Sequence, residues 1–211
     1  ASEAALIVPR QNGKGDVLLG KALHSMFLSP AKLILWSAHE FKTAREMFLR
    51  VQETIDGCDA LRRLVRRVRT SHGEEGVELN DGTRLGFVAR SRGSGRGFSP
   101  DELLLDEAFA LTDEQVAAMM PAISARDNPF ILYASSHPLP TSTVLRRICQ
   151  RGRAGGPGLI YIEYSADPEA ANDDPQAWAA ANPAYPYRIG DDSIRRELGS
   201  MDGADFRRER L

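Results

Sequence analysis

The run from Val8 to Gly15, VPRQNGKG, combines residue types that suit a bound phosphate. A loop whose backbone N–H groups face one point, ahead of a helix N-terminus, favours an anion, and Lys14 adds a charge for β- and γ-phosphates. The usual motif is G-x-x-x-x-G-K-[ST]. Val8 stands in place of its first glycine and Gly15 in place of its hydroxyl residue. The sequence therefore predicts a phosphate-binding loop with two departures from the motif.

Two adjacent carboxylates form a second feature. Asp106 and Glu107 follow the apolar run 102–105 directly. In nucleoside triphosphatases a carboxylate holds Mg²⁺, and another polarises or orients the attacking water. Neighbouring residues at a strand end point in different directions, so one acid can face a metal while the other faces the γ-phosphate. Together with Lys14, this pair predicts a site for ATP and Mg²⁺.

Two further segments carry suitable groups. Ser135 and Ser136 end the apolar run 130–135, where hydroxyls can sense a γ-phosphate by hydrogen bonding. The loop 90–98 holds Arg90, Arg92 and Arg96 among glycines and serines. Glycine lets a backbone move and guanidinium suits phosphate, so this loop could bind a DNA backbone or reach the ATP of a neighbouring subunit.

These residues require elements that bring them together, and short apolar runs alternate with amphipathic ones along the chain. The expected strands are 4–8, 32–37, 77–79, 84–89, 102–105, 130–135 and 159–165. The expected helices are 16–27, 40–55, 112–120 and 143–150, whereas 61–69 is ambiguous. Asp81 and Gly82 predict a hairpin turn. This alternation predicts an α/β fold with a mainly parallel sheet between helices.

The composition changes after residue 165. The stretch 166–187 is rich in Ala, Asp, Pro and Asn, and a polar helix is expected from about Asp191 or Asp192 toward Leu211. We therefore expect a core domain over 1–165 and a small helical linker subdomain over 166–211.

Composition narrows the class of protein. A chain of 211 residues can hold one α/β domain with a small appendage, and no apolar run approaches the ~20 residues of a membrane span. The net charge of −2 gives no global signal for nucleic acid. The 23 arginines, against 4 lysines, nevertheless form local clusters that are either solvated surface or phosphate contacts. Cys58 and Cys149 stand apart and are expected to be reduced thiols.

Taken together, these residues resemble the ATPase domain of the large terminase subunit, the DNA-packaging motor of tailed bacteriophages. Its variant phosphate loop, Arg-Gln-x-Gly-Lys, matches Arg10 to Lys14. The other matching segments are 36–44, 90–98 with 103–108, 135–137, and the ending with Trp178, Asn182, Pro183 and 206–209.

The resemblance implies an ASCE-type P-loop NTPase fold and a set of roles. Lys14 would bind the β- and γ-phosphates, and Arg10 would contact the γ-phosphate within the same subunit. Asp106 would serve Mg²⁺, and Glu107 would orient the hydrolytic water. Ser135 and Ser136 would couple hydrolysis to movement. The implied nucleotide-binding residues are Arg10, Gln11, Asn12, Gly13, Lys14, Gly15 and Asp16, and the candidates for an arginine acting in trans are Arg90, Arg92 and Arg96.

The resemblance also implies partners. These are double-stranded DNA, a portal protein, a small terminase subunit and other copies in a ring, with no membrane, at the procapsid portal in the host cytoplasm. The family's adenine-contacting segment would lie before Val8 and its nuclease domain after Leu211. The chain alone is therefore expected to lack DNA cleavage.

Two alternatives remain at this point. One is the ATPase core of a helicase-like or repair translocase. The other is a hydrolysis-impaired module that binds nucleotide or DNA, because Gly15 offers no side-chain ligand. Either Mg²⁺ is held by phosphates, water and Asp106, or Asp16 assists, or hydrolysis is weak.

Overall fold

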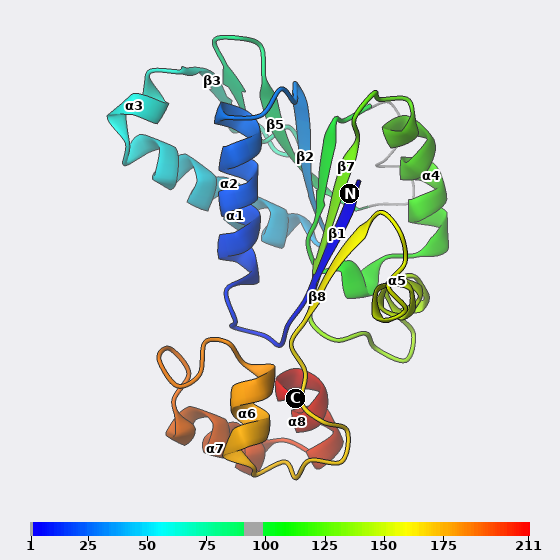
Figure 1. The fold of residues 1–211 in the computed structure, drawn as a ribbon. Coiled ribbons are helices and arrows are strands. Elements are labelled where there is room, and N and C mark those ends of the chain that lie inside the picture. The colour runs from blue at the N-terminus through cyan, green and yellow to red at the C-terminus, as the bar shows by residue number, and fades with distance from the viewer. Residues whose placement is uncertain (1, 91–98) are drawn as a thin grey trace.

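An eight-stranded sheet runs through the main body of the computed structural model, which describes residues 2–90 and 99–211 (Figure 1). The strand order is β3-β4-β5-β2-β6-β7-β1-β8. Along this order, all neighbouring strands from β5 to β8 are parallel. The β3–β4 and β4–β5 pairs are antiparallel. The strands are β1 (Glu3–Ile7), β2 (Leu33–Ala38), β3 (Val65–Arg69), β4 (Gly76–Leu79), β5 (Arg84–Ala89), β6 (Glu102–Leu105), β7 (Phe130–Ser135) and β8 (Leu159–Glu163). The predicted mainly parallel sheet and the hairpin between β4 and β5 are confirmed.

Helices cover both faces of this sheet (Figure 1). Helices α1 (Lys14–Phe27) and α2 (Phe41–Asp56) pack on one face, and α4 (Asp113–Ser124) and α5 (Thr143–Arg153) lie on the other. Strand β6 shows the alternation, because Leu104 joins the first core while Leu103 and Leu105 join the second. A strand buried on both faces reads as an unbroken apolar run, which is why β6 was predictable.

The carboxyl ends of three central strands open at one edge. Ile7 of β1 lies opposite Ser135 of β7, and Leu105 of β6 lies opposite Tyr133. Strand β7 therefore separates the phosphate-loop strand from the acid-bearing strand. Ligands of open parallel sheets bind outside these carboxyl ends, so the topology brings the predicted site residues to one place.

Residues 166–211 form a helical subdomain beside the loop that joins β1 to α1 (Figure 1). It contains α6 (Pro175–Ala181), α7 (Asp191–Ser200) and α8 (Gly203–Arg210). Trp178 and Phe206 are fully buried in a hydrophobic cluster of its own. The single helix expected from residue 191 onward was wrong. It divides at Asp202, whose side chain accepts from Ala204 N and starts a new helix.

The remaining differences concern element ends. Helix α1 starts at Lys14, two residues earlier than expected, because Gly13 forms its N-cap. The ambiguous stretch contains both α3 (Asp59–Arg62) and β3, and a short 3₁₀ helix, η1 (Ala108–Ala110), follows the acidic pair. Among the described residues, no helix combines the length and the apolar character needed to cross a membrane.

Candidate active site

The phosphate loop owes its shape to two residues in the left-handed region. Gln11 has φ 63° and Gly13 has φ 79°, and Gly13 O accepts from the N–H groups of Asp16 and Val17 at 2.9 and 3.1 Å. Glycine adopts this conformation without the cost that a Cβ brings. The chain therefore turns sharply after β1 and enters α1 with its first N–H groups at the strand ends.

Lys14 spans the loop that it follows. Its Nζ donates to Val8 O at 2.8 Å and to Pro9 O at 2.9 Å. Burial lowers the pKa of Lys14 from 10.5 to about 8, and the Asp106 carboxylate opposes that shift. At neutral pH the ammonium is thus mostly charged, and a phosphate would compete with two carbonyls for it.

The acidic pair turns its two carboxylates in different directions. Asp106 Oδ1 accepts from Glu107 N at 2.9 Å, and burial raises the pKa of Asp106. Glu107 has φ 50°, which is uncommon for a residue with a side chain and is found mostly where surrounding structure enforces it. Its carboxylate accepts from His39 N at 3.2 Å and lies 3.5 Å from Thr43 Oγ1.

A cleft of about 750 Å³ joins these groups. A volume of this size suits a nucleotide-sized ligand. The predicted site residues that line it are Arg10, Gln11, Gly13, Lys14, Gly15, Asp16, Asp106, Glu107, Ser135 and Ser136. Sequence reasoning missed Thr43, Arg50, Phe109 and Arg188, which complete the lining. Thr43 and Arg50 belong to α2. Thr43 lies in the matching segment 36–44 but was assigned no role, and no motif marks Arg50, because only the packing of α2 beside α1 brings it to the loop.

The donor set fits a metal held mainly by one carboxylate. Within residues 2–90 and 99–211, no group of three His, Cys, Asp or Glu residues could hold an ion by itself. Mg²⁺ typically binds through one or two carboxylates, substrate phosphates and water, so Asp106 suffices. The Asp16 carboxylate instead faces two guanidinium groups, with Arg50 at 2.5 Å and Arg188 at 3.6 Å. This arrangement speaks against the expectation that Asp16 assists the metal.

The Arg90 side chain points into the interior of its own subunit. Its guanidinium is buried and donates to Ser37 O at 2.7 Å, Asp106 O at 2.6 Å and Glu107 O at 2.9 Å. Burial lowers the pKa of Arg90 to about 10, so it stays charged at neutral pH. The expectation that Arg90 acts in trans is therefore wrong, because its guanidinium positions the acidic pair of its own subunit. Arg92 and Arg96 lie outside the described residues.

Ser135 connects the phosphate loop to the segment after the acids. Ser135 O accepts from Val8 N at 3.0 Å, and Ser135 Oγ accepts from Phe109 N at 3.0 Å. The hydroxyl is fully buried between these partners, while Ser136 lines the cleft. The end of β7 therefore touches both halves of the site.

The C-terminal subdomain contacts the phosphate loop on the side that faces away from the cleft. Asn12 points away from the cleft, because its Nδ2 donates to Asn182 Oδ1 at 2.9 Å and its Oδ1 accepts from Ala184 N at 3.1 Å. Arg210 donates to Arg10 O at 3.1 Å and to Gln11 Oε1 at 3.0 Å.

A salt bridge also joins the loop to the subdomain. Arg10 Nε lies 2.8 Å from Glu209 Oε2, although the Arg10 side chain stays two-thirds exposed. Three consecutive loop residues thus contact the subdomain, a connection that the sequence did not predict.

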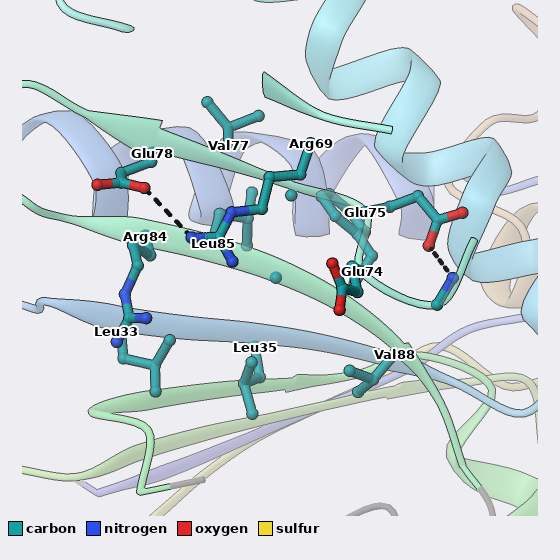
Figure 2. A pocket seen from close by; sticks show the side chains of 14 residues that line it. Leu33, Leu35, Arg69, Glu74, Glu75, Val77, Glu78, Arg84, Leu85 and Val88 are labelled. Atoms are coloured by element: carbon teal, nitrogen blue, oxygen red, sulfur yellow. Dashed lines mark hydrogen bonds and ion pairs between the residues drawn. The ribbon is translucent and has the colours of Figure 1, made fainter. Parts of the chain in front are cut away.

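A second cavity, of about 200 Å³, lies beside strands β2 to β5 (Figure 2). Leu33, Leu35 and Val88 line it, and Arg69 pairs with Glu78 at 3.4 Å across its rim. Its described lining includes none of the residues predicted for phosphate or metal. We therefore place the candidate active site at the strand ends.

No protein-family model matches the chain, and no curated protein matches it in sequence. Solved structures do match. The large terminase of bacteriophage HK97 superposes with a TM-score of 0.88 at 22% identity, over 100% of this chain and 46% of that one. A variant of the Thermus phage P74-26 large terminase ATPase domain gives 0.72 at 18% identity, over 100% and 88%.

A third match is the large terminase of a thermophilic bacteriophage in complex with ADP. It gives a TM-score of 0.66 at 10% identity, over 99% of this chain and 47% of that one. The chain thus spans about half the length of two of these terminases and most of the isolated ATPase domain. It therefore has the fold of the ATPase domain of phage large terminases.

Proposed function

We propose that the chain hydrolyses ATP as the ATPase domain of a phage DNA-packaging motor. The observation that carries this proposal is the convergence of Lys14, Asp106 and Glu107 on one cleft at the carboxyl ends of β1 and β6. The likeness in fold to phage large terminases supports it, and so does the ADP that one of those structures contains.

The residues divide the work as follows. Lys14 binds the β- and γ-phosphates, and the N–H groups around Gly13 cradle them. Glu107 orients a water for attack on the γ-phosphorus and accepts its proton as the bond to the β-γ bridging oxygen breaks. Asp106 holds Mg²⁺, which when bound neutralises charge on the phosphate oxygens. Arg10 contacts the γ-phosphate once it leaves Glu209, and Ser135 and Ser136 pass the change to the rest of the sheet.

The wider assembly is part of the same proposal. The motor moves double-stranded DNA, works as a ring of copies and docks with a portal protein and a small terminase subunit. It acts at the procapsid portal in the host cytoplasm. Arg92 or Arg96 completes the site of a neighbouring copy.

The test is steady-state ATP hydrolysis with and without double-stranded DNA. We expect turnover that DNA stimulates and that Glu107→Gln abolishes while ATP affinity survives, because the amide keeps the shape of Glu107 but cannot accept a proton. Lys14→Ala should lose affinity itself. Turnover unchanged in Glu107→Gln would remove this residue from its role, and wild-type protein that binds nucleotide without hydrolysing it would identify a binding module.

A further inference from the structure

Gly15 faces an occupied space. A Cβ added to Gly15 would lie 3.0 Å from Arg50 Nη1, 3.6 Å from Met47 Cε and 3.7 Å from Met47 Sδ. The contact of 3.0 Å is tighter than ordinary van der Waals packing. The place that a serine or threonine side chain takes in an ordinary phosphate loop is therefore filled here by a guanidinium group from helix α2.

Arg50 is held in that place by neighbours on two helices. Its Nη2 donates to Asp16 Oδ1 at 2.5 Å, and its Nη1 lies 3.9 Å from Met47 Sδ. Asp16 is in the first turn of α1, directly after Gly15. The ion pair thus fixes the guanidinium beside the phosphate loop.

Arg50 lines the same cleft as Lys14, Gly15 and Asp106. Guanidinium stays charged at every working pH and offers a planar fork of donors that matches phosphate oxygens. Among the contacts of the described residues, Nη1 meets only a thioether sulfur, which is a weak acceptor. This nitrogen therefore keeps its donors for a stronger acceptor in the cleft.

We propose that Arg50 binds a nucleotide phosphate within its own subunit, in place of the missing hydroxyl at residue 15. The proposal rests on the proposed function, because it requires nucleotide in this cleft. Arg50 then supplies positive charge that a hydroxyl-anchored metal supplies in ordinary phosphate loops. The affinity for nucleotide should accordingly depend strongly on residue 50 and only weakly on Mg²⁺.

The first experiment measures the affinity for ADP and ATPγS by calorimetry, with Mg²⁺ and with EDTA. Because bonds to charged groups are the strong ones, Arg50→Gln should bind about tenfold more weakly in both conditions. Arg50→Lys should recover part of the loss, since it restores charge without the fork. Arg45→Gln, an exposed arginine of the same helix, is the matched control and should bind like the wild type.

The second experiment uses the crowding between residues 15 and 50. Gly15→Ser alone should weaken binding, because its side chain displaces the guanidinium. In an Arg50→Ala background the same change should strengthen binding, and only when Mg²⁺ is present, because the hydroxyl then finds room. A reversal of sign between the two backgrounds is the mark of direct coupling.

The outcomes separate the two proposals. If Arg50→Gln and Gly15→Ser bind nucleotide like the wild type, the role of Arg50 is overturned while the proposed function stands. If folded wild-type protein binds no nucleotide at all, both fail. Thermal unfolding of each variant establishes that the chain is folded, which the partly exposed side chain of Arg50 leads us to expect.

Discussion

At the scale of single residues, each positive side chain of the site has a polar or acidic partner within the protein. Lys14 bonds to two carbonyls of its own loop, Arg10 pairs with Glu209, and Arg50 pairs with Asp16. Lys14 and Arg10 therefore have partners that a phosphate must replace, whereas Arg50 can keep its bond to Asp16 and use Nη1. The exchange is favourable because phosphate is a stronger acceptor than a carbonyl and carries more charge than one carboxylate.

The lowered pKa of Lys14 predicts how nucleotide affinity varies with pH. In the free protein Lys14 loses its proton above about pH 8. When a phosphate is bound beside it, Lys14 stays protonated. Affinity for ADP should therefore fall by roughly an order of magnitude between pH 7.5 and 9.5. Fluorescence titration with an ADP analogue measures this. Lys14→Arg, which stays charged throughout, should flatten the profile, and a flat wild-type profile would contradict the lowered pKa.

At the scale of elements, the end of β5 is joined to the acid strand by one side chain. Arg90 follows β5, and its guanidinium holds carbonyls at the ends of β2 and β6. Its backbone N–H also donates to Ala38 O at 2.9 Å. The left-handed conformation of Glu107 is thus enforced by a bond to its own carbonyl.

Removal of Arg90 should damage both stability and hydrolysis. Arg90→Leu leaves buried carbonyls unsatisfied, which should lower the free energy of unfolding by about 2–4 kcal/mol. Turnover should fall further than nucleotide affinity, because Glu107 loses its position while the phosphate loop remains. Urea unfolding and steady-state kinetics measure the two effects. Arg84→Gln, on the exposed side of the same strand, serves as the control. An equal fall in affinity and turnover would contradict this assignment.

The central strands and their chemistry were predictable from sequence, but the cross-element contacts were not. Residues 102–105 and 130–135 are short, largely apolar runs that end at polar groups, so both strand and site could be predicted. Arg50 and Arg188 lie outside any motif, and Asn182 was matched only as part of the ending, so their contacts with the phosphate loop follow from packing alone. Arg90 was misassigned for a related reason. Its neighbours are glycine, serine and arginine, and nothing in that composition shows that its own side chain turns inward.

At the scale of the whole molecule, the C-terminal subdomain and the phosphate loop form one connected unit. Asn182 is fully buried and donates to Trp178 O at 3.0 Å and Arg210 O at 2.8 Å, while it accepts from Asn12. One amide thus secures the subdomain core and the loop together. A change in the loop on nucleotide binding must be accommodated by these bonds.

Two variants should separate these functions of Asn182. Asn12→Ala removes the contacts with the subdomain and the bonds of Asn12 to Pro9 O and Arg10 O but leaves the subdomain core intact, so hydrogen exchange should rise in the loop and at 182–185 while the melting temperature changes little. Asn182→Ala also breaks the internal bonds, so we expect it to lose about 2–4 kcal/mol of stability. Exchange mass spectrometry and urea unfolding measure both effects. Equal losses of stability in the two variants would show that the loop contact, rather than the subdomain core, dominates.

A shared active site predicts complementation between subunits. If Arg92 or Arg96 acts on a neighbouring copy, its alanine variant should be inactive alone but regain turnover when mixed with Glu107→Gln. The mixture contains sites with an intact acid next to a subunit with an intact arginine. Specific activity of the wild type should also rise with protein concentration. Mixtures that remain inactive at every ratio would argue for an arginine acting within its own chain.

The three carbonyls held by Arg90 also have a mechanical meaning. Residue 90 is fixed through its N–H and its side chain at once, and the segment 91–98 begins directly after it. A force applied to that segment is therefore borne by the backbone of Asp106 and Glu107, with little slack between. In the proposed motor, a load on this segment would therefore slow or stall the hydrolytic step that Glu107 carries out.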